Sequence, residues 1–231
     1  MCLIIAKPNS TGISLPAEYI ENAAINNPHG FGLIGKLPDG SIYTAKTMDM
    51  QESLGIVRDF EREHADIVCH FRYATHGKKN EDNCHPFRLG KTENYLVHNG
   101  VLPIEIENEA MSDTWHFAER LNRKLKRKGY TRRQVRRFMY ARWGMISTSK
   151  FVIMGEDIPM TIVNEKLGVM RKGVWYSNEY SLKSRYISYS KTNSSDWLSQ
   201  FDALNGTISE PTSEDDCEMC GNELTETEWE R

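Results

Sequence analysis

Short apolar runs alternate with amphipathic helical segments along the first 180 residues, and this alternation constrains the fold more than any other feature of the chain. Strands are predicted at 2–7, 30–36, 41–46, 67–73, 94–98, 150–155, 159–163, 168–171 and 174–178. Helices are predicted at 16–26, 50–64, 112–128 and 131–142. The sequences Leu-Pro-Asp-Gly at 37–40 and Met-Arg-Lys-Gly at 170–173 favour tight hairpin turns. The pattern predicts a mixed α and β chain, compatible with two stacked sheets between helical layers.

Composition is that of a globular protein with one substantial domain and a tail. The chain has 231 residues, of which 39% are hydrophobic and 26% are charged, so it can bury a sizeable core. No apolar run approaches the ~18 residues of a membrane span, and no secretory leader is evident. The five cysteines are an odd number, which favours a reducing compartment. We therefore expect a cytoplasmic protein without a membrane segment.

Cys2 is the first candidate for chemistry. Removal of Met1 would leave this thiol on the N-terminal residue, close to a free α-amine. An α-amine titrates near ~7.7 to 8.0 and a thiol near ~8.5, so the two groups can exchange a proton at neutral pH. The residue would then combine a nucleophile with its own base. The alternative is that Cys2 packs as a small hydrophobic side chain at the start of the first strand.

Three motifs follow behind this cysteine, in the order His70-Phe71-Arg72-Tyr73-Ala74-Thr75-His76-Gly77, Val97-His98-Asn99-Gly100 and Ser112-Asp113-Thr114. Together with Cys2 they resemble the glutaminase domain of class II glutamine amidotransferases, which are N-terminal-nucleophile hydrolases. The resemblance covers roughly residues 2 to 180. It implies an α+β fold, a four-layer αββα sandwich with a flexible C-terminal tail.

The resemblance also implies how glutamine would be bound. Arg72 offers a planar fork of donors for the α-carboxylate, and Asp113 offers an anion for the α-ammonium group. Thr75 and His76 are expected to line the pocket beside Arg72, and His98 either lines it or packs as a hydrogen-bonded strand histidine. Without the resemblance, Arg72 would be interpreted as an exposed charge at a strand end and Asp113 as a helix N-cap.

Asn99 and Gly100 are interpreted as the oxyanion hole, through the side-chain amide of Asn99 and the backbone N–H of Gly100. In the implied mechanism Cys2 adds to the γ-carboxamide, ammonia leaves, and water hydrolyses the γ-glutamyl thioester to glutamate. This reaction needs no metal and no organic cofactor. Two departures from the family are noted: Leu3 follows Cys2 where many members have glycine, and the asparagine that often follows the His-Asn-Gly motif is absent.

The resemblance leaves the fate of the ammonia open. Familiar members join this domain to a large synthase domain, and nothing after residue 180 of this sequence suggests one. We therefore expect a glutaminase that takes L-glutamine and supplies ammonia to a separate synthase or ligase. Two alternatives remain: an amidohydrolase of the same fold that acts on γ-glutamyl amides, and a non-enzymatic adaptor.

The segment 120–142 carries eleven of the 29 lysine and arginine residues of the chain. A solvated helical face is the ordinary interpretation, and the alternatives are an acidic partner, the acidic tail of the chain itself, or nucleic acid. The net charge of −3 argues against a dedicated nucleic-acid-binding protein.

The predicted domains are a glutaminase domain at 2–187 and an acidic, mobile tail at 188–231. The tail contains Cys217 and Cys220, which could supply two of the four ligands of a structural zinc site, and an unliganded tail is the more ordinary interpretation. Cys69 lies in an apolar run and is expected in the core. Cys84 lies in a polar loop and is expected to be a free surface thiol.

Overall fold

The computed structural model describes residues 2–125 and 131–183, and in them the strands form two antiparallel sheets. The six-stranded sheet has the order β3 (Ile42–Thr47), β2 (Phe31–Lys36), β4 (Asp66–Phe71), β1 (Leu3–Lys7), β10 (Val174–Tyr176), β9 (Val169–Arg171). The four-stranded sheet has the order β5 (Phe87–Arg88), β6 (Asn94–Asn99), β7 (Lys150–Gly155), β8 (Thr161–Val163).

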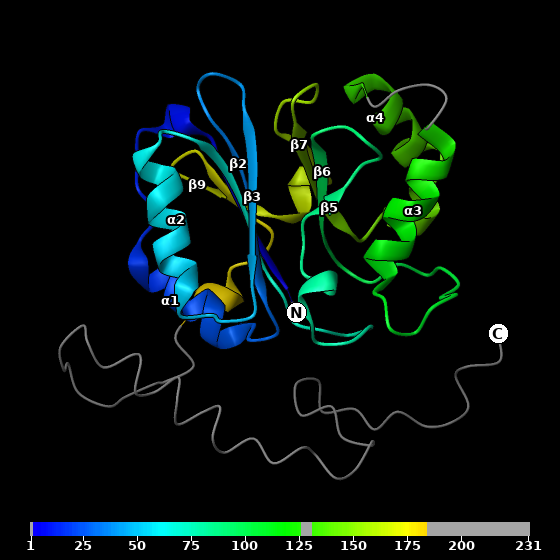
Figure 1. Cartoon of the computed structure of the whole chain (residues 1–231), viewed down its shortest axis with the longest axis horizontal. Coiled ribbons are helices and arrows are strands. Elements are labelled where there is room, and N and C mark those ends of the chain that lie inside the picture. The colour runs from blue at the N-terminus through cyan, green and yellow to red at the C-terminus, as the bar shows by residue number, and fades with distance from the viewer. Residues whose placement is uncertain (1, 126–130, 184–231) are drawn as a thin grey trace, which may run out of the picture. The chain divides into compact units, whose positions relative to one another are not determined.

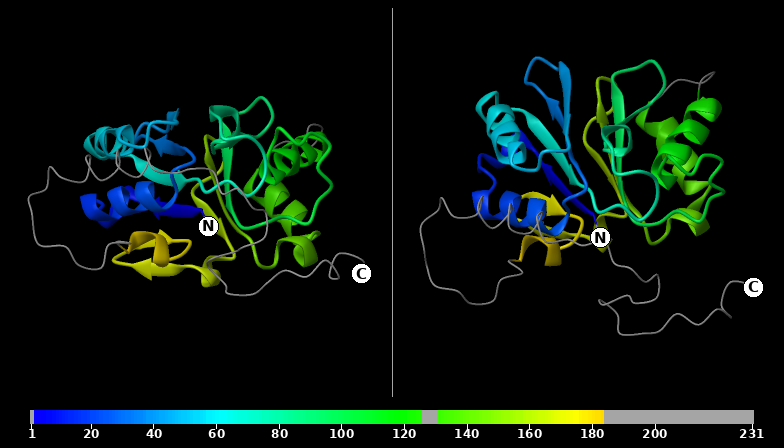
Figure 2. Two further views of the ribbon diagram at one scale, coloured as in Figure 1. Left: turned by 90° about the horizontal axis from the view of Figure 1, so that it is seen from below. Right: turned by 60° about the horizontal axis from the view of Figure 1, so that its bottom comes forward.

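Helices cover the outer faces of both sheets (Figures 1 and 2). The six-stranded sheet carries α1 (Ala17–Asn26) and α2 (Glu52–Arg62), and the four-stranded sheet carries α3 (Asp113–Leu125) and α4 (Arg132–Tyr140), which is followed by the short α5 (Trp143–Ile146). The layers therefore run helix, sheet, sheet, helix. The predicted α+β, four-layer αββα sandwich is confirmed.

The two sheets pack face to face through aliphatic side chains. Ile4 and Val68 from the six-stranded sheet meet Val97 and Val152 from the four-stranded sheet in one buried cluster. Side chains alternate along a strand, so Ile5 of β1 points to the helical side, and it too is fully buried. Full burial of such a side chain stabilises the fold by roughly 1.5–3 kcal/mol, which explains why the first strand is apolar throughout.

A second core lies between the four-stranded sheet and its helices. Phe117 of α3 packs on Phe151 of β7 with ring centroids 5.4 Å apart, and it meets Phe138 of α4 edge to face at 5.9 Å. Leu121 and Ile153 complete the contact between α3 and the sheet. The period of apolar residues in α3 and α4 thus matches the face that each helix buries.

The strand ends bring the three sequence motifs together. Leu3 pairs with Phe71 between β1 and β4, so Cys2 and Arg72 lie at the same end of the sheet. The strand β6 of the facing sheet ends at Asn99, and α3 begins at Asp113. Residues that are 70 to 110 positions apart in the sequence therefore meet at one end of the sandwich.

The predicted helices and strands lie within about two residues of the observed ones in the described part of the chain. Both predicted hairpins are present, with positive φ at Gly40 and at Lys172-Gly173. The sequence missed β5, which is only two residues long, and the break after Tyr140 that separates α5 from α4. The last residues of the helix predicted at 112–128, the tail and its Cys217 and Cys220 lie outside the described residues.

The structure confirms the predicted burial of Cys69 but not the predicted exposure of Cys84. Cys69 is fully buried in β4, as predicted. Cys84 was predicted at the surface, and this prediction is wrong because the thiol is fully buried against the Met48 thioether at 3.6 Å and the Asn80 carbonyl at 3.5 Å. The loop is polar, but it turns Asn83, Cys84 and His85 inward. Across 2–125 and 131–183, no helix combines the length and the apolar character needed to cross a bilayer.

Candidate active site

A small hollow lies where the three motifs meet, with a volume of about 20 Å³. It is formed by the N-terminus, the loop after β4, the end of β6 and the start of α3, and its lining residues are Cys2, Arg72, Tyr73, Ala74, Thr75, His76, His85, His98, Gly100, Ser112, Asp113 and Thr114. All predicted site residues except Asn99 line it. A space of this size holds about one water molecule, so it must widen before a glutamine side chain can enter.

The thiol of Cys2 is half-buried and held by the backbone of Tyr73. The Tyr73 N–H donates to Sγ at 3.2 Å, and the thiol donates to the Tyr73 carbonyl at 3.3 Å. Burial raises the pKa of the thiol, while the Tyr73 N–H and the Arg72 charge oppose that effect. Because the thiol is then protonated at neutral pH, it needs a base to become a nucleophile.

The carbonyl oxygen of Cys2 is fixed by two side-chain amides. Asn99 Nδ2 donates to it at 2.6 Å, and Asn178 Nδ2 donates to it at 2.8 Å. Asn99 Nδ2 also donates to Ser177 Oγ at 2.7 Å, and that hydroxyl accepts the Ile4 N–H at 2.8 Å. Both N–H groups of the Asn99 amide are therefore engaged with residues beside the N-terminal strand. In this structure the Asn99 amide therefore bonds Cys2 and Ser177 and does not line the hollow.

Gly100 occupies a backbone conformation that other residues rarely adopt, with φ of 150°. A methyl group built on it would lie 2.5 Å from Ser149 Oγ and 3.0 Å from His98 Nε2, which is too close in both cases. The absence of a side chain lets the backbone of Gly100 form the wall of the hollow. This is the property that the predicted oxyanion role requires.

Arg72 is buried, with 3% of its surface exposed, so its interpretation as an exposed strand-end charge is wrong. Its guanidinium donates to the carbonyl oxygens of His76 and Lys78, both at 3.0 Å. These two bonds use two of its five donors and fold the loop that carries Thr75 around the hollow. Arg72 therefore shapes the pocket wall and presents a cation to it.

Asp113 is the first residue of α3, but it does not cap the helix. Ser112 is the cap, since its Oγ accepts the Trp115 N–H at 3.2 Å, so the interpretation of Asp113 as the N-cap is wrong. Asp113 Oδ2 instead accepts the Leu102 N–H at 2.8 Å. The carboxylate thereby joins the start of α3 to the segment that follows Gly100.

His98 is both a packed strand histidine and a lining residue. Its Nδ1 lies 2.7 Å from Thr114 Oγ1 and its ring stacks on Phe151 at 4.5 Å. Burial lowers the pKa of His98 to about 4, so the ring is neutral at physiological pH. Within the described residues its buried Nε2 has no hydrogen-bond partner, which leaves one nitrogen available beside Gly100.

Several residues that hold the site in place lie outside the three sequence motifs. His29 Nδ1 accepts the Ala74 N–H at 2.9 Å and its ring packs on Tyr73 at 4.9 Å. Burial lowers the pKa of His29 to about 4, so it remains a neutral acceptor. Asn178 reaches Cys2, and Ser177 reaches Ile4 and Asn99, only because β10 pairs with β1, a relationship that one sequence does not reveal.

The part of the chain covered by 2–125 and 131–183 contains no group of three or more His, Cys, Asp or Glu side chains arranged to hold a metal ion. The cysteine pair that the sequence analysis considered for zinc lies outside those ranges.

Residues 45–116 match the family described as "Glutamine amidotransferases class-II", and this segment contains Arg72, Asn99, Gly100 and Asp113. This segment of the chain has the sequence of a class II glutamine amidotransferase. The predicted family is therefore confirmed, and it consists of enzymes that act on the side-chain amide of glutamine.

Individual relatives match this chain over short segments. It is 49% identical over 51 residues to "Glutamine--fructose-6-phosphate aminotransferase [isomerizing]" of Lactococcus lactis, which is 21% of this chain and 8% of that protein. The enzyme of the same name from Streptococcus pneumoniae is 52% identical over 47 residues, or 20% of this chain and 8% of the relative. The matched segments thus span less than a tenth of these curated relatives.

A solved structure with a similar chain is glutamine phosphoribosylpyrophosphate amidotransferase from B. subtilis, complexed with ADP and GMP. The similarity covers 78% of this chain and 42% of that chain, with 17% identity and a TM-score of 0.43.

Proposed function

We propose that this class II glutamine amidotransferase hydrolyses the side-chain amide of L-glutamine through a thioester on Cys2 and supplies the ammonia to a separate synthase or ligase. The observation that carries the proposal is the meeting of Cys2, Arg72, Gly100 and Asp113 around one hollow. These residues supply a nucleophile, a carboxylate-binding cation, an oxyanion donor and an ammonium-binding anion.

The proposed reaction begins with removal of Met1, which places the α-amine on Cys2. The amine accepts the thiol proton, and Sγ adds to the γ-carboxamide carbon of glutamine. The oxyanion is stabilised by the Gly100 N–H and, after a rotation of its side chain away from the Cys2 carbonyl, by Asn99. The C–N bond breaks, ammonia leaves with the proton from the amine, and water then cleaves the thioester to release glutamate.

Substrate binding needs a wider hollow than the one described. We propose that the loop at 73–77 shifts, since Tyr73, Thr75 and His76 are exposed while Arg72 and Asp113 are buried, and the shift must break the bond of Arg72 to the His76 carbonyl. We expect Arg72 to hold the α-carboxylate and Asp113 the α-ammonium group once this loop shifts outward. Thr75 and His76 would then contact the bound amino acid.

We also propose which kind of protein receives the ammonia and where in the cell the reaction takes place. Ammonia released into solvent is lost to synthesis, so we propose that a synthase or ligase receives it directly. The free thiols Cys2, Cys69 and Cys84 support a reducing compartment, and we propose the cytoplasm.

The test uses the electrophile 6-diazo-5-oxo-norleucine, a glutamine mimic, on protein whose N-terminus has been checked by mass spectrometry. We expect one adduct, mapped to Cys2, that glutamine prevents and that the Cys2→Ala variant lacks. The Cys84→Ala variant is the matched control and should label normally, because Cys84 is not in the hollow. A correctly processed chain that is not labelled, or is labelled elsewhere, would contradict the proposal.

Assays on the same purified protein distinguish the glutaminase from the two alternative functions. Release of ammonia from glutamine should exceed its release from γ-glutamyl amides with larger amide substituents. A preference for those amides would indicate an amidohydrolase with a different substrate. Full biological function in the Cys2→Ala variant would indicate an adaptor.

A further inference from the structure

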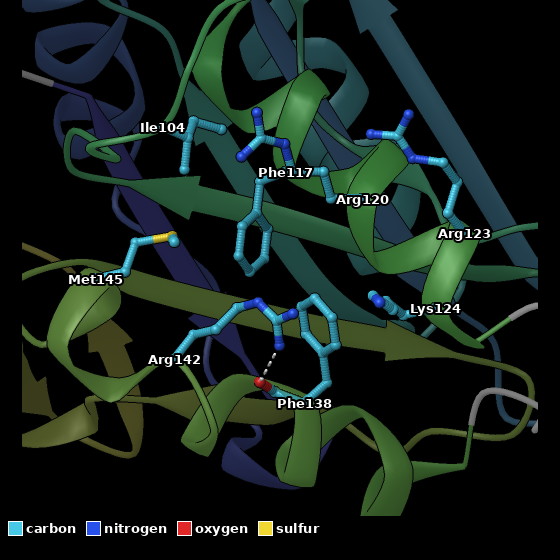
Figure 3. A pocket seen from close by; sticks show the side chains of 8 residues that line it. All are labelled: Ile104, Phe117, Arg120, Arg123, Lys124, Phe138, Arg142 and Met145. Carbon is cyan, nitrogen blue, oxygen red and sulfur yellow. Dashed lines mark hydrogen bonds between the residues drawn. The ribbon is translucent and has the colours of Figure 1, made fainter.

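A second and much larger hollow lies on the helical side of the four-stranded sheet, and it shares no lining residue with the hollow at Cys2. It has a volume of about 410 Å³ and is enclosed by α3, α4, α5 and the segment that follows Gly100 (Figure 3). We call it the basic pocket. Its lining consists of Ile104, Phe117, Arg120, Arg123, Lys124, Phe138, Arg142 and Met145.

The charge of the basic pocket is entirely positive. Three cations come from the later turns of α3 and the fourth, Arg142, from the junction of α4 and α5. No carboxylate lines the pocket, and among the described residues the one carboxylate in ion-pair range of these cations is Glu107, 3.9 Å from Arg120. Like charges around one hollow repel each other, so an anion that enters is favoured by the relief of that repulsion as well as by direct attraction.

The floor of the basic pocket is apolar and rigid. Phe117 and Phe138 pack edge to face at its base and are almost fully buried, so the apolar side chains that a ligand can contact are the half-buried Ile104 and Met145 (Figure 3). The Arg142 guanidinium lies 3.8 Å from the centre of the Phe138 ring and donates to the Phe138 carbonyl at 3.4 Å. Arg142 is thus held in place before any ligand binds, which reduces the entropy lost on binding.

We propose that the basic pocket binds a small phosphorylated molecule with an apolar ring system, of the size of a mononucleotide. A volume of about 410 Å³ lies within the range of small-molecule sites, which are typically lined by apolar side chains with a few charged groups that set orientation. Guanidinium groups match the oxygens of a phosphate in a bidentate manner, and the apolar floor accommodates the remainder of the ligand. A bare inorganic ion would leave that floor unused.

A small ligand accounts for the pocket better than a polyanion does. The exposed arginines of α4 that face away from it, Arg132 and Arg136, line a different hollow together with β8 residues. A nucleic acid or an acidic polymer would use these arginines as readily as the pocket cations, because phosphate contacts are not specific for position. A small phosphate ester would use only the enclosed set.

The test compares two double variants that each remove two positive charges. Arg123→Gln with Lys124→Gln changes the pocket, and Arg132→Gln with Arg136→Gln changes the other side of α4. All four side chains are exposed, so both variants should fold, which circular dichroism and thermal unfolding can verify. Binding of adenosine 5′-monophosphate to the full chain is measured by calorimetry, with adenosine and inorganic phosphate as reference ligands.

We expect saturable one-to-one binding of the nucleotide that the pocket variant weakens by about tenfold or more and the control variant by less than about twofold. Binding should persist in the Cys2→Ala variant, so the result does not depend on the proposed glutaminase activity. No saturable binding of the nucleotide would overturn the proposal. Equal losses in the two double variants would also overturn it and indicate a diffuse basic surface for polyanions. The proposal requires that the phosphate and the ring of the nucleotide both contribute to affinity. It would be refuted if adenosine or phosphate alone bound as tightly as the nucleotide.

Discussion

The side-chain amide of Asn99 donates a hydrogen bond to the carbonyl oxygen of Cys2 at 2.6 Å, and Asn178 donates to the same oxygen at 2.8 Å. The residue predicted to stabilise the oxyanion thus also fixes the backbone of the predicted nucleophile. The two asparagines differ in position, since Asn99 adjoins Gly100 whereas Asn178 follows β10. This difference allows the two roles to be separated by mutation.

Replacing Asn99 with alanine should lower kcat by about 10² to 10³, the loss typical of one oxyanion donor. It should also lower the free energy of unfolding by about 1–3 kcal/mol, because a buried acceptor on Cys2 loses a partner. Asn178→Ala is the control, and it should reduce stability with a much smaller effect on kcat. Equal losses of kcat in both variants would mean that Asn99 only positions Cys2.

The Arg72→Lys variant should lower kcat/KM for glutamine by about 10- to 100-fold, mainly through KM. Lysine keeps the charge, but its ammonium group cannot hold the carbonyls of His76 and Lys78 and also bind a carboxylate with two parallel bonds. Steady-state kinetics of glutamate release measure this. An unchanged KM would show that Arg72 does not contact the substrate.

The Gly100→Ala variant should be destabilised or inactive, since the added methyl group meets Ser149 Oγ at 2.5 Å and the backbone has a φ of 150°. Gly55→Ala in α2 is the matched control, because nothing lies within 4 Å of a methyl group there. That substitution should stabilise the fold by about 0.5–1 kcal/mol through its helix propensity. Thermal unfolding of both variants tests the contrast, and equal behaviour would contradict the described geometry.

Acid should destabilise the protein in a defined range of pH. Burial lowers the pKa of His98 to about 4 and that of His70 to about 3. In the unfolded chain a histidine has a pKa of about 6.5, so between that value and the folded-state pKa the unfolded state binds more protons. Stability is complete above about pH 6.5 and should fall as the pH is lowered toward 4.

Unfolding midpoints measured between pH 7.5 and 4.5 test this pH dependence. The His70→Phe variant should show a shallower decline, because one buried titrating ring is removed. His64→Gln, which changes an exposed residue, should leave the decline unchanged. A decline of the same steepness in the His70→Phe variant would show that other groups control acid sensitivity.

The sequence by itself determined most of the secondary structure, the resemblance to a family and seven of the twelve residues that line the hollow at Cys2. These properties are local: strand alternation, helix period and hairpin turns depend on neighbours along the chain, and the motifs are contiguous. The hairpins at Gly40 and Gly173 and the buried first strand were predictable for this reason.

The tertiary structure decided what depends on distant contacts. The bonds of Ser177 and Asn178 beside Cys2 require the pairing of β10 with β1 across 170 residues. The burial of Cys84 and Arg72 follows from how the segments after β4 fold, although Cys84 stands in a polar loop and Arg72 is itself charged. Among the described residues of the basic segment, Arg120, Arg123, Lys124 and Arg142 line the basic pocket, whereas Arg132 and Arg136 line a different hollow. Side-chain direction relative to another element is set by packing in three dimensions, and a linear pattern does not contain it.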